Sequence, residues 1–399
     1  MKKSVHILLG IPADTEFGRG VIQGIIRFAA TNNWILGSVP AHGKPDNDGD
    51  TSKWSVEERG GAIALIETRE QADAIAQLNV PCVSISSALG DNDLPYVACD
   101  ERNIGSLAAS HFLERQMRHF GFVGLPGRSD SEARRAGFTD RLAVDGITKV
   151  AHHDAPEKFD PESFRQLIEW IDSLSKPAGI FTMTDALGRT VIDACRAGSI
   201  RVPGSVSVLG CGNDPVVCGL SSPSLSSVAL PAERVGFDAA DLLLQLMTHK
   251  KPLESHRLVQ VSSVIPREST DNVSVRDPDV ANALRFILAH AGEWIGVREL
   301  LLALPVQRRS LERKFRKVLG RSPLEEIRRV RVDLAKQLLS STDLPMPIVA
   351  RRSGFSEAKQ LSQVFRALVG VTPTSYRANF RLPDKGPVDG NAVELEESK

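Results

Sequence analysis

Residues 354–377, GFSEAKQLSQVFRALVGVTPTSYR, carry side chains that can contact DNA bases at helical spacing. One face of the expected helix is apolar, because its residues recur at intervals of three and four: Leu361, Val364, Phe365 and Leu368. The other face is polar or small: Ala358, Lys359, Ser362, Gln363 and Arg366. In the major groove lysine donates to guanine, glutamine pairs with adenine, and an alanine methyl meets the methyl of thymine. This face therefore has the chemistry of a base-reading surface.

Residues typical of helix ends stand on both sides of this expected helix. Ser356 stands where an N-cap belongs, and Gly370 stands where the helix should end. Thr372 and Pro373 are typical of the N-cap and first position of a following helix. A short helix that begins at 348–350 and ends at Gly354 precedes the polar-faced helix. This order predicts a helix-turn-helix.

The same pattern occurs fifty residues earlier, where Leu311, Phe315 and Gly320 match Leu361, Phe365 and Gly370. The outer face of this earlier helix carries Arg308, Arg309, Glu312, Arg313 and Arg316. The C-terminal region is therefore expected to be an internal duplication of one helix-turn-helix. Gln307, which precedes the first reading helix, is a poorer N-cap than serine.

A helix over about 324–340 is expected to join the two units. Its apolar positions are Leu324, Ile327, Leu334, Ala335 and Leu338. At ~1.5 Å per residue it spans roughly 25 Å, which can hold two reading helices about one DNA turn, ~34 Å, apart. Arg328, Arg329 and Arg331 on this helix are interpreted as contacts to the DNA backbone rather than as a solvated face, by a small margin.

GF at 354–355, VF at 364–365 and G-x-TP-x-x-YR at 370–377 resemble the signature of AraC/XylS-type transcription regulators. The resemblance covers about residues 279–381 and implies an all-α domain of seven helices that binds a double-stranded DNA operator. It places base contacts at Arg309 and Arg313 in the first unit, and at Ala358, Lys359 and Gln363 in the second. Arg308, Glu312 and Ser362 are their neighbours, and Arg316 and Arg366 are assigned to phosphate. Any one of these arginines can instead contact phosphate alone.

The charge distribution agrees with one DNA-binding part. The whole chain of 399 residues has 49 basic and 49 acidic residues. Residues 279–385 contain 20 Lys and Arg against 10 Asp and Glu, so the remainder has an equal acidic excess. A basic C-terminal part joined to an acidic N-terminal part suggests that only the former meets a polyanion.

Residues 1–268 alternate short apolar runs with amphipathic stretches. Strands are expected at 5–10, 61–67, 82–86, 96–100, 119–126, 179–183, 205–210 and 258–266. Helices are expected at 18–33, 70–77, 103–115, 131–144, 185–197 and 233–247. Such alternation predicts parallel, doubly wound α/β sheets, here in two lobes.

Several segments of this part resemble the LacI-type and periplasmic sugar-binding effector domains. They are FGRGVIQGI after the first strand, RxxGF at 134–138, TDALG at 184–188, VPGSVSVLG at 202–210 and LSSVAL at 225–230. The resemblance implies a two-lobed domain that binds a small sugar, a pentose such as xylose, and a homodimer that activates transcription with RNA polymerase.

Candidate sugar ligands follow the carboxyl ends of expected strands, where open α/β sheets bind small molecules. They are Phe17, Arg19, Arg134, Asp185, Asn213 and Asp214. By resemblance, Arg134 and Asp185 are the best candidates for binding sugar hydroxyl groups. The alternatives are that Asp185 merely caps its helix and that Arg134 is merely a solvated cation. Gly212 stands where related domains often carry an aspartate, which leaves a dimerisation role without ligand open.

Other classes of function have less support. Gly121, Gly124 and Gly127 form GxxGxxG rather than the dinucleotide fingerprint, and neither a P-loop nor a GxSxG elbow is present. An enzyme is therefore not expected, and no cofactor is implied. His152, His153 and Asp154 are interpreted as a solvated loop rather than a metal site.

The remaining segments complete the expected organisation. Residues 269–278 are a polar linker, 279–385 the DNA-binding domain, and 386–399 an acidic disordered tail. Five cysteines without a CxxC pair are typical of reduced thiols in the cytoplasm. The apolar run at 5–11 is too short for a signal peptide, and no stretch reaches membrane-spanning length.

Overall fold

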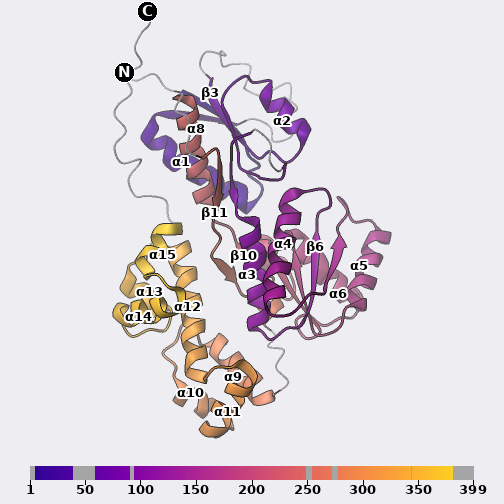
Figure 1. Ribbon diagram of the computed structural model, residues 1–399, viewed down its shortest axis with the longest axis vertical. Helices are drawn as coiled ribbons and strands as arrows, with labels where there is room; N and C mark the ends of the chain where they lie inside the picture. Colours follow the sequence, from indigo (N-terminus) through magenta and orange to yellow (C-terminus); the bar gives the residue numbers. More distant parts are fainter. Residues whose placement is uncertain are drawn as a thin grey trace, which may run out of the picture.

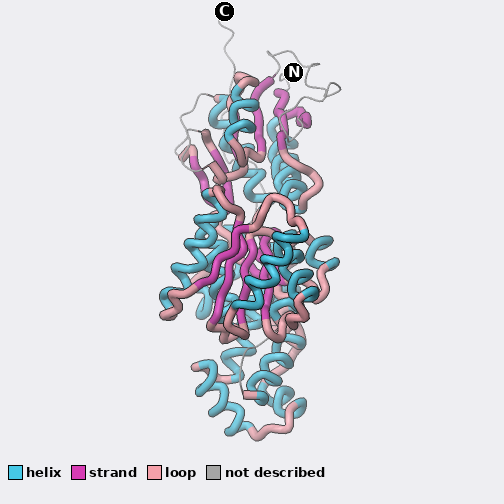
Figure 2. The backbone as a smooth tube through the Cα atoms, turned by 90° about the vertical axis from the view of Figure 1, so that its right-hand side faces the viewer, coloured by secondary structure: helices cyan, strands magenta, loops and turns pink. Residues whose placement is uncertain are grey.

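The computed structural model describes residues 5–38, 59–89, 94–248, 254–271, 277–342 and 344–380 (Figure 1). The expected acidic tail at 386–399 lies outside this part of the chain. Within it, two α/β lobes precede a group of helices, which confirms the predicted fold class. Figure 2 shows the strands of the second lobe near the middle of the long axis, with the first lobe toward one end and part of the C-terminal helices toward the other.

The first lobe is built on a sheet whose neighbouring strands are all parallel. In spatial order its strands are β11 (His256–Val259), β5 (Tyr96–Cys99), β4 (Cys82–Ser84), β3 (Arg59–Ala64), β1 (Val5–Gly10) and β2 (Trp34–Ser38). Its helices are α1 (Glu16–Asn32), α2 (Arg69–Ala76) and α8 (Ala232–Met247). Helices α1 and α8 pack side by side over the main core of this lobe (Figure 1).

The second lobe has a parallel sheet with one antiparallel edge strand, β12. Its strands are β12 (Ser263–Ile265), β10 (Ser226–Ala229), β9 (Val206–Gly212), β8 (Ala178–Thr182), β6 (His119–Gly124) and β7 (Val150–Asp154). Its helices are α3 (Glu101–Glu114), α4 (Ser129–Val144), α5 (Pro161–Ser173), α6 (Asp185–Ala197) and α7 (Pro215–Leu220). The single strand expected at 258–266 is instead divided between the two sheets, because the chain crosses between lobes at 260–262.

Helices α3 and α4 approach unusually closely. A Cβ on Gly105 of α3 would lie 2.1 Å from the Arg134 carbonyl oxygen, and one on Gly137 of α4 would lie 2.0 Å from that of Arg102. Any larger side chain at these positions would force the helices apart. The two helices therefore form one closely packed pair in the second lobe.

Two further sequence expectations in the α/β part differ from the structure. His152, His153 and Asp154 form the end of the edge strand β7 rather than a loop. Ser269 and Thr270, expected in the linker, are instead fully buried in a short helix, Glu268–Thr270, that packs on the second sheet. Residues 272–276 of the expected linker lie outside the described part of the chain. At its other end, Asp277 caps the first C-terminal helix.

The C-terminal part contains seven helices in the described residues, as expected. They are α9 (Pro278–Ala289), α10 (Val297–Ala303), α11 (Arg308–Leu319), α12 (Pro323–Ser341), α13 (Met346–Arg352), α14 (Ala358–Val369) and α15 (Pro373–Phe380). They enclose two small cores that share α12: Ile327 and Val330 pack into the first, and Val332, Ala335 and Leu339 into the second. Leu324, expected in the core, is 43% exposed. None of the described helices is long and apolar enough to cross a bilayer.

A buried histidine lies where the α/β part ends. His111 on α3 contacts the Thr270 hydroxyl through Nε2 at 2.9 Å, and its Nδ1 lies 3.1 Å from an Arg115 guanidinium nitrogen. Arginine can only donate, so Nδ1 accepts and Nε2 carries the proton. Burial, reinforced by the charges of Arg115 and Arg329, holds the pKa of His111 well below its usual range.

We expect this histidine to make stability depend on pH. The pKa of His111 is lower in the folded state than in the unfolded state. The stability linked to the neutral histidine is therefore fully present above the unfolded pKa, near 6.5, and is lost as pH falls below that value. Each pH unit below that value should lower the free energy of unfolding by up to ~1.4 kcal/mol. Urea denaturation at pH 7.5, 6.5 and 5.5 should show a smaller loss for His111→Gln than for the wild type. The exposed His119→Gln should follow the wild type, and equal slopes for all three proteins would refute the prediction.

Candidate ligand cleft and nucleic-acid interface

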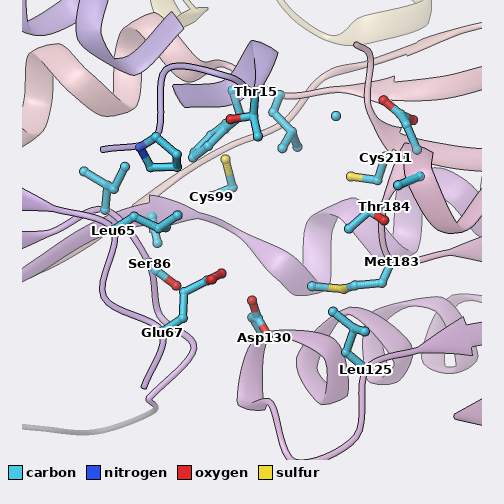
Figure 3. A pocket seen from close by; sticks show the side chains of 18 of the residues that line it. Thr15, Leu65, Glu67, Ser86, Cys99, Leu125, Asp130, Met183, Thr184 and Cys211 are labelled. Atoms are coloured by element: carbon cyan, nitrogen blue, oxygen red, sulfur yellow. The ribbon is translucent and has the colours of Figure 1, made fainter. Parts of the chain in front are cut away.

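A cavity of about 580 Å³ lies between the two α/β lobes. Loops that follow the strands of both sheets line it, as Figure 3 shows. The first lobe contributes Thr15, Phe17, Leu65, Glu67, Ser86 and Cys99. The second contributes Leu125, Asp130, Arg134, Met183, Thr184, Asp185, Cys211 and Asp214. The cavity thus contains four of the six predicted ligand residues: Phe17, Arg134, Asp185 and Asp214.

Arg134 is held in the wall of the cavity by other residues of the protein. Its side chain is buried, and Nε donates to the Glu101 carboxylate at 2.6 Å, with a second bond from Nη2 to the same carboxylate. Nη1 donates to the Met183 carbonyl oxygen at 2.5 Å. A guanidinium has five N–H groups, and these bonds use three of them. Burial raises the pKa of Glu101, while the charge of Arg134 opposes that rise.

Asp185 is also engaged within the protein. Its carboxylate accepts from the Ser227 hydroxyl at 2.5 Å and from the Asp214 backbone N–H at 2.8 Å. Burial raises the pKa of this carboxyl group. It does not act as the N-cap of α6, because the Thr184 hydroxyl accepts from the Leu187 N–H. Asp185 is therefore a buried acceptor that faces the cavity and fixes the loop after β9.

The position of the Asp185 carboxylate accounts for the glycine at position 212. Its φ of +127° is a conformation that only glycine adopts easily. A Cβ there would lie 3.0 Å from an Asp185 carboxylate oxygen. Asp185 therefore occupies the space that a side chain at position 212 would need, and glycine at this position leaves a carboxylate in the wall.

Two predicted ligand residues are not among those lining the cavity. Arg19 is turned toward the start of its own helix, where it donates to the Glu16 carboxylate and to the carbonyl oxygens of Ala13 and Asp14 in the preceding turn. Asn213 accepts from Arg267 at 2.8 Å, which holds its side chain against the segment after β12. Position after a strand end does not determine where a side chain points, and in both cases a closer partner determines it.

Polar residues that were not predicted from the sequence join the two lobes at the edge of the cavity. Arg128 of the second lobe binds Glu67 of the first lobe at 2.5 Å and Asp130 of its own lobe at 2.6 Å. The Ser129 hydroxyl donates to the carbonyl oxygens of Ser87 and Ala88, each at 2.8 Å. Because these residues follow strands β3, β4 and β6, the strand-end rule could have found them.

Glu101 was missed for a different reason. The helix after β5 was expected to begin at Asn103, but it begins at Glu101. Asp100 is the N-cap, because its carboxylate accepts from the Asn103 N–H at 3.0 Å. The aspartate at the end of the strand segment 96–100 was the signal that could have corrected the boundary.

The first reading helix, α11, presents a basic face. Its exposed residues include Arg308, Arg309, Arg313 and Arg316, and Arg308 forms an ion pair with Glu312 at 2.9 Å. Leu311 and Phe315 on the opposite face are buried. Gln307 makes no side-chain cap bond, as its residue type predicted.

The second reading helix, α14, is arranged in the same way. Lys359, Gln363 and Arg366 are exposed, whereas Ala358 and Ser362 are half-buried. Leu361 and Phe365 are buried as expected, but Leu368 is 54% exposed and lies outside the core. The N-cap position is Glu357 rather than Ser356, whose hydroxyl donates to Gln360 instead.

Two arginines that were assigned to the DNA backbone are used elsewhere. Arg329 binds Glu326 and Asp333 of its own helix and Glu114 of α3, all within 2.9 Å. Arg331 is buried beneath Phe355 and donates to the carbonyl oxygens of Glu293 and Ile295. Their partners inside the protein occupy the guanidinium groups, so the assignment to phosphate was wrong for both.

A two-lobed α/β domain with a cleft, followed by two helix-turn-helix units, defines a DNA-binding transcription regulator with a periplasmic-binding-protein-like effector domain. Residues 109–270 match the family described as periplasmic binding protein-like domain, and residues 301–379 match the helix-turn-helix domain. The chain belongs to the family of xylose operon regulatory proteins.

The relatives support this assignment over nearly the whole length. The xylose operon regulatory protein of Escherichia coli (strain K12) is 30% identical over 388 residues, which cover 94% of this chain and 97% of that protein. The protein of the same name from Haemophilus influenzae is 28% identical, over 80% of this chain and 85% of its own. The solved structure of the xylose-binding transcription activator xylR matches with a TM-score of 0.58, at 28% identity, over 94% of this chain and 98% of that one. These relatives are transcription regulators.

Proposed function

We propose that this regulator binds a neutral pentose such as xylose in the cleft between its lobes and thereby controls operator binding. We further propose that it acts in the cytoplasm as a homodimeric activator that works with RNA polymerase. The observation that carries the proposal is the 580 Å³ cavity, whose walls present Arg134, Glu101, Asp185 and other carboxylates. That volume lies within the usual range of small-molecule sites. The relatives' names support the choice of sugar.

The charges in the cleft support an uncharged ligand. Seven carboxylates line the cavity: Asp14, Glu16, Glu67, Glu101, Asp130, Asp185 and Asp214. The basic residues in the lining are Arg128 and Arg134, and both form ion pairs with these carboxylates. A phosphorylated or carboxylated sugar would meet net repulsion, whereas hydroxyl groups can donate to the carboxylates. Phe17, half-buried at the cavity, offers an aromatic face.

The division of work between the two parts is also a proposal. We assign ligand binding to the chain up to residue 271 and DNA binding to the helices from Asp277 onward. In the first unit Arg309 and Arg313 would contact bases, with Arg308 and Glu312 beside them. In the second unit Lys359, Gln363 and Ala358 would contact bases, with Ser362 beside them. Arg316 and Arg366 would contact phosphate.

Calorimetric titration of the chain with xylose, arabinose, ribose and glucose tests the proposal. We expect the wild type to bind a pentose and Asp185→Ala to bind it ten-fold or more weakly. A hydrogen bond to a charged group contributes about 1.5–3 kcal/mol, and 1.4 kcal/mol is a factor of ten. Asp193→Ala is a matched control, because this half-buried aspartate lies on the same helix but is not among the residues that line the cavity. If the Asp185→Ala variant bound the pentose as tightly as the wild type, Asp185 would only hold the loop after β9 in place and would not bind the sugar.

The alternative is an effector domain that only dimerises. Its support is that both carboxylate oxygens of Asp185 already have partners within the protein. In that case no sugar, pentose or hexose, would give heat or change DNA binding, while the chain would still be a dimer in solution.

A further inference from the structure

Two segments lead from the cleft region to the DNA-binding helices. The first is α3, whose first residue, Glu101, lines the cleft and whose last residue, Glu114, meets α12. At ~1.5 Å per residue its 14 residues span about 20 Å. The second is the hinge segment, residues 260–265, in which the chain crosses from sheet to sheet. Figure 1 shows α3 descending along α4 on the side of α12.

The cleft ends of these two segments are bonded to each other. The Asp100 carboxylate accepts from the Gln260 side chain at 2.7 Å, and Asn103 accepts from the Val261 N–H at 2.8 Å. Arg134 holds Glu101 from the neighbouring helix α4, which packs closely on α3. A change in the angle between the lobes must therefore act on both the start of α3 and the hinge segment.

Their far ends receive bonds from the DNA-binding part. Glu114 forms an ion pair with Arg329 of α12 at 2.6 Å. The carbonyl oxygen of Ser262 accepts from the Tyr376 hydroxyl at 3.3 Å, and that of Val264 accepts from Gln337 at 2.9 Å. These contacts reach α12 and α15, which both pack in the second core, so they bear directly on the second helix-turn-helix unit.

We propose that this docking surface, formed by Glu114 and the hinge segment on one side and by Arg329, Gln337 and Tyr376 on the other, transmits the ligand state of the cleft to the DNA-binding helices. Glu114 and Tyr376 are positioning residues that contact neither sugar nor DNA. A ligand shifts an equilibrium only by its difference in affinity between two states. The cleft supplies that difference, and the docking surface couples it to the DNA-binding helices, because it lies on the segments that also form the edge of the cleft. The inference rests on the proposed sugar response.

The test uses the full chain, a DNA fragment selected by the wild-type chain from a random pool, and the pentose that binds best in calorimetry. Fluorescence anisotropy gives DNA affinity with and without the pentose, and calorimetry without DNA gives pentose affinity. We expect pentose to change wild-type DNA affinity at least ten-fold, and Glu114→Gln and Tyr376→Phe each to reduce this factor below about three-fold. Pentose affinity without DNA should stay within about two-fold of wild type. Glu157→Gln, an exposed glutamate of the same lobe, should keep the wild-type factor.

The coupling between pentose binding and DNA binding is reciprocal, so the same coupling factor can be measured in a second way. DNA must change the affinity for pentose by the same factor that pentose changes the affinity for DNA, and both factors should fall together in the variants. Unchanged factors in both variants would overturn the inference, as would equal losses of DNA affinity with and without pentose. A wild-type chain that binds no sugar would instead remove the proposed function, and this inference with it.

Discussion

Replacing Arg134 by alanine is expected to abolish sugar binding and to lower the free energy of unfolding by about 3–5 kcal/mol. Arg134 is only 4% exposed, and its removal would leave the Glu101 carboxylate in the cleft wall without its cation. Removal of one partner from a buried ion pair is costly because the other charge stays buried. Urea denaturation followed by circular dichroism measures the stability, and calorimetry measures the binding.

A double variant separates these two effects. Arg134→Leu combined with Glu101→Leu removes both charges, and apolar pairs of this kind often restore the stability that a broken pair loses. We therefore expect the double variant to be close to wild-type stability but still unable to bind the pentose. Sugar affinity that returned with stability would show that the pair only supports the fold. Arg102→Ala, which breaks an exposed ion pair with Asp140 on the same two helices, should change neither property strongly.

The two reading helices should contribute to specificity at different base pairs. We expect Arg309→Ala and Lys359→Ala each to cost about 1–3 kcal/mol of operator binding. Each should also relax the preference at its own position, and the two positions should lie about one helical turn apart. Arg309 and Lys359 are exposed at matching offsets on α11 and α14. Anisotropy titrations against single-base variants of the selected DNA fragment measure these preferences.

Arg366→Ala is the matched control, because this exposed arginine lies at the end of α14 and is assigned to phosphate. It should weaken binding to all sequences similarly and lower the slope of affinity against salt. If Arg309→Ala and Lys359→Ala also lost the same affinity for every variant, both residues would be phosphate contacts. The specificity would then arise elsewhere on the two units.

The helix-turn-helix units were predictable because their signals are local. Leu361 and Phe365 mark the buried face within one helix, and Gly370 ends that helix with φ of +86°, as Gly320 ends the earlier one with φ of +70°. The alternation of strands and helices likewise predicted the two lobes. The strand boundaries within 258–266 could not be predicted, because an apolar run does not show that its two halves belong to different sheets.

The partners of charged residues were not predictable, because they come from distant parts of the chain. Arg329 is 215 positions from Glu114, and Arg134 is 33 positions from Glu101. No spacing rule connects such pairs, so Arg329 was taken for a DNA contact. The same limit applies to Arg19, whose nearest acceptors are carbonyl groups rather than a ligand.

Helix α12 has a consequence for the DNA that the protein can recognise. Its 19 residues, about 28 Å in all, are anchored in a separate core at each end, so the span between the two reading helices has a fixed length. One base pair inserted between their two sites would move the second site by about 3.4 Å along the DNA and about 35° around it. A rigid helix between the two units cannot adjust to this combined shift and rotation. The operator must therefore keep its internal spacing, and an altered spacing would leave one of the two units without its site.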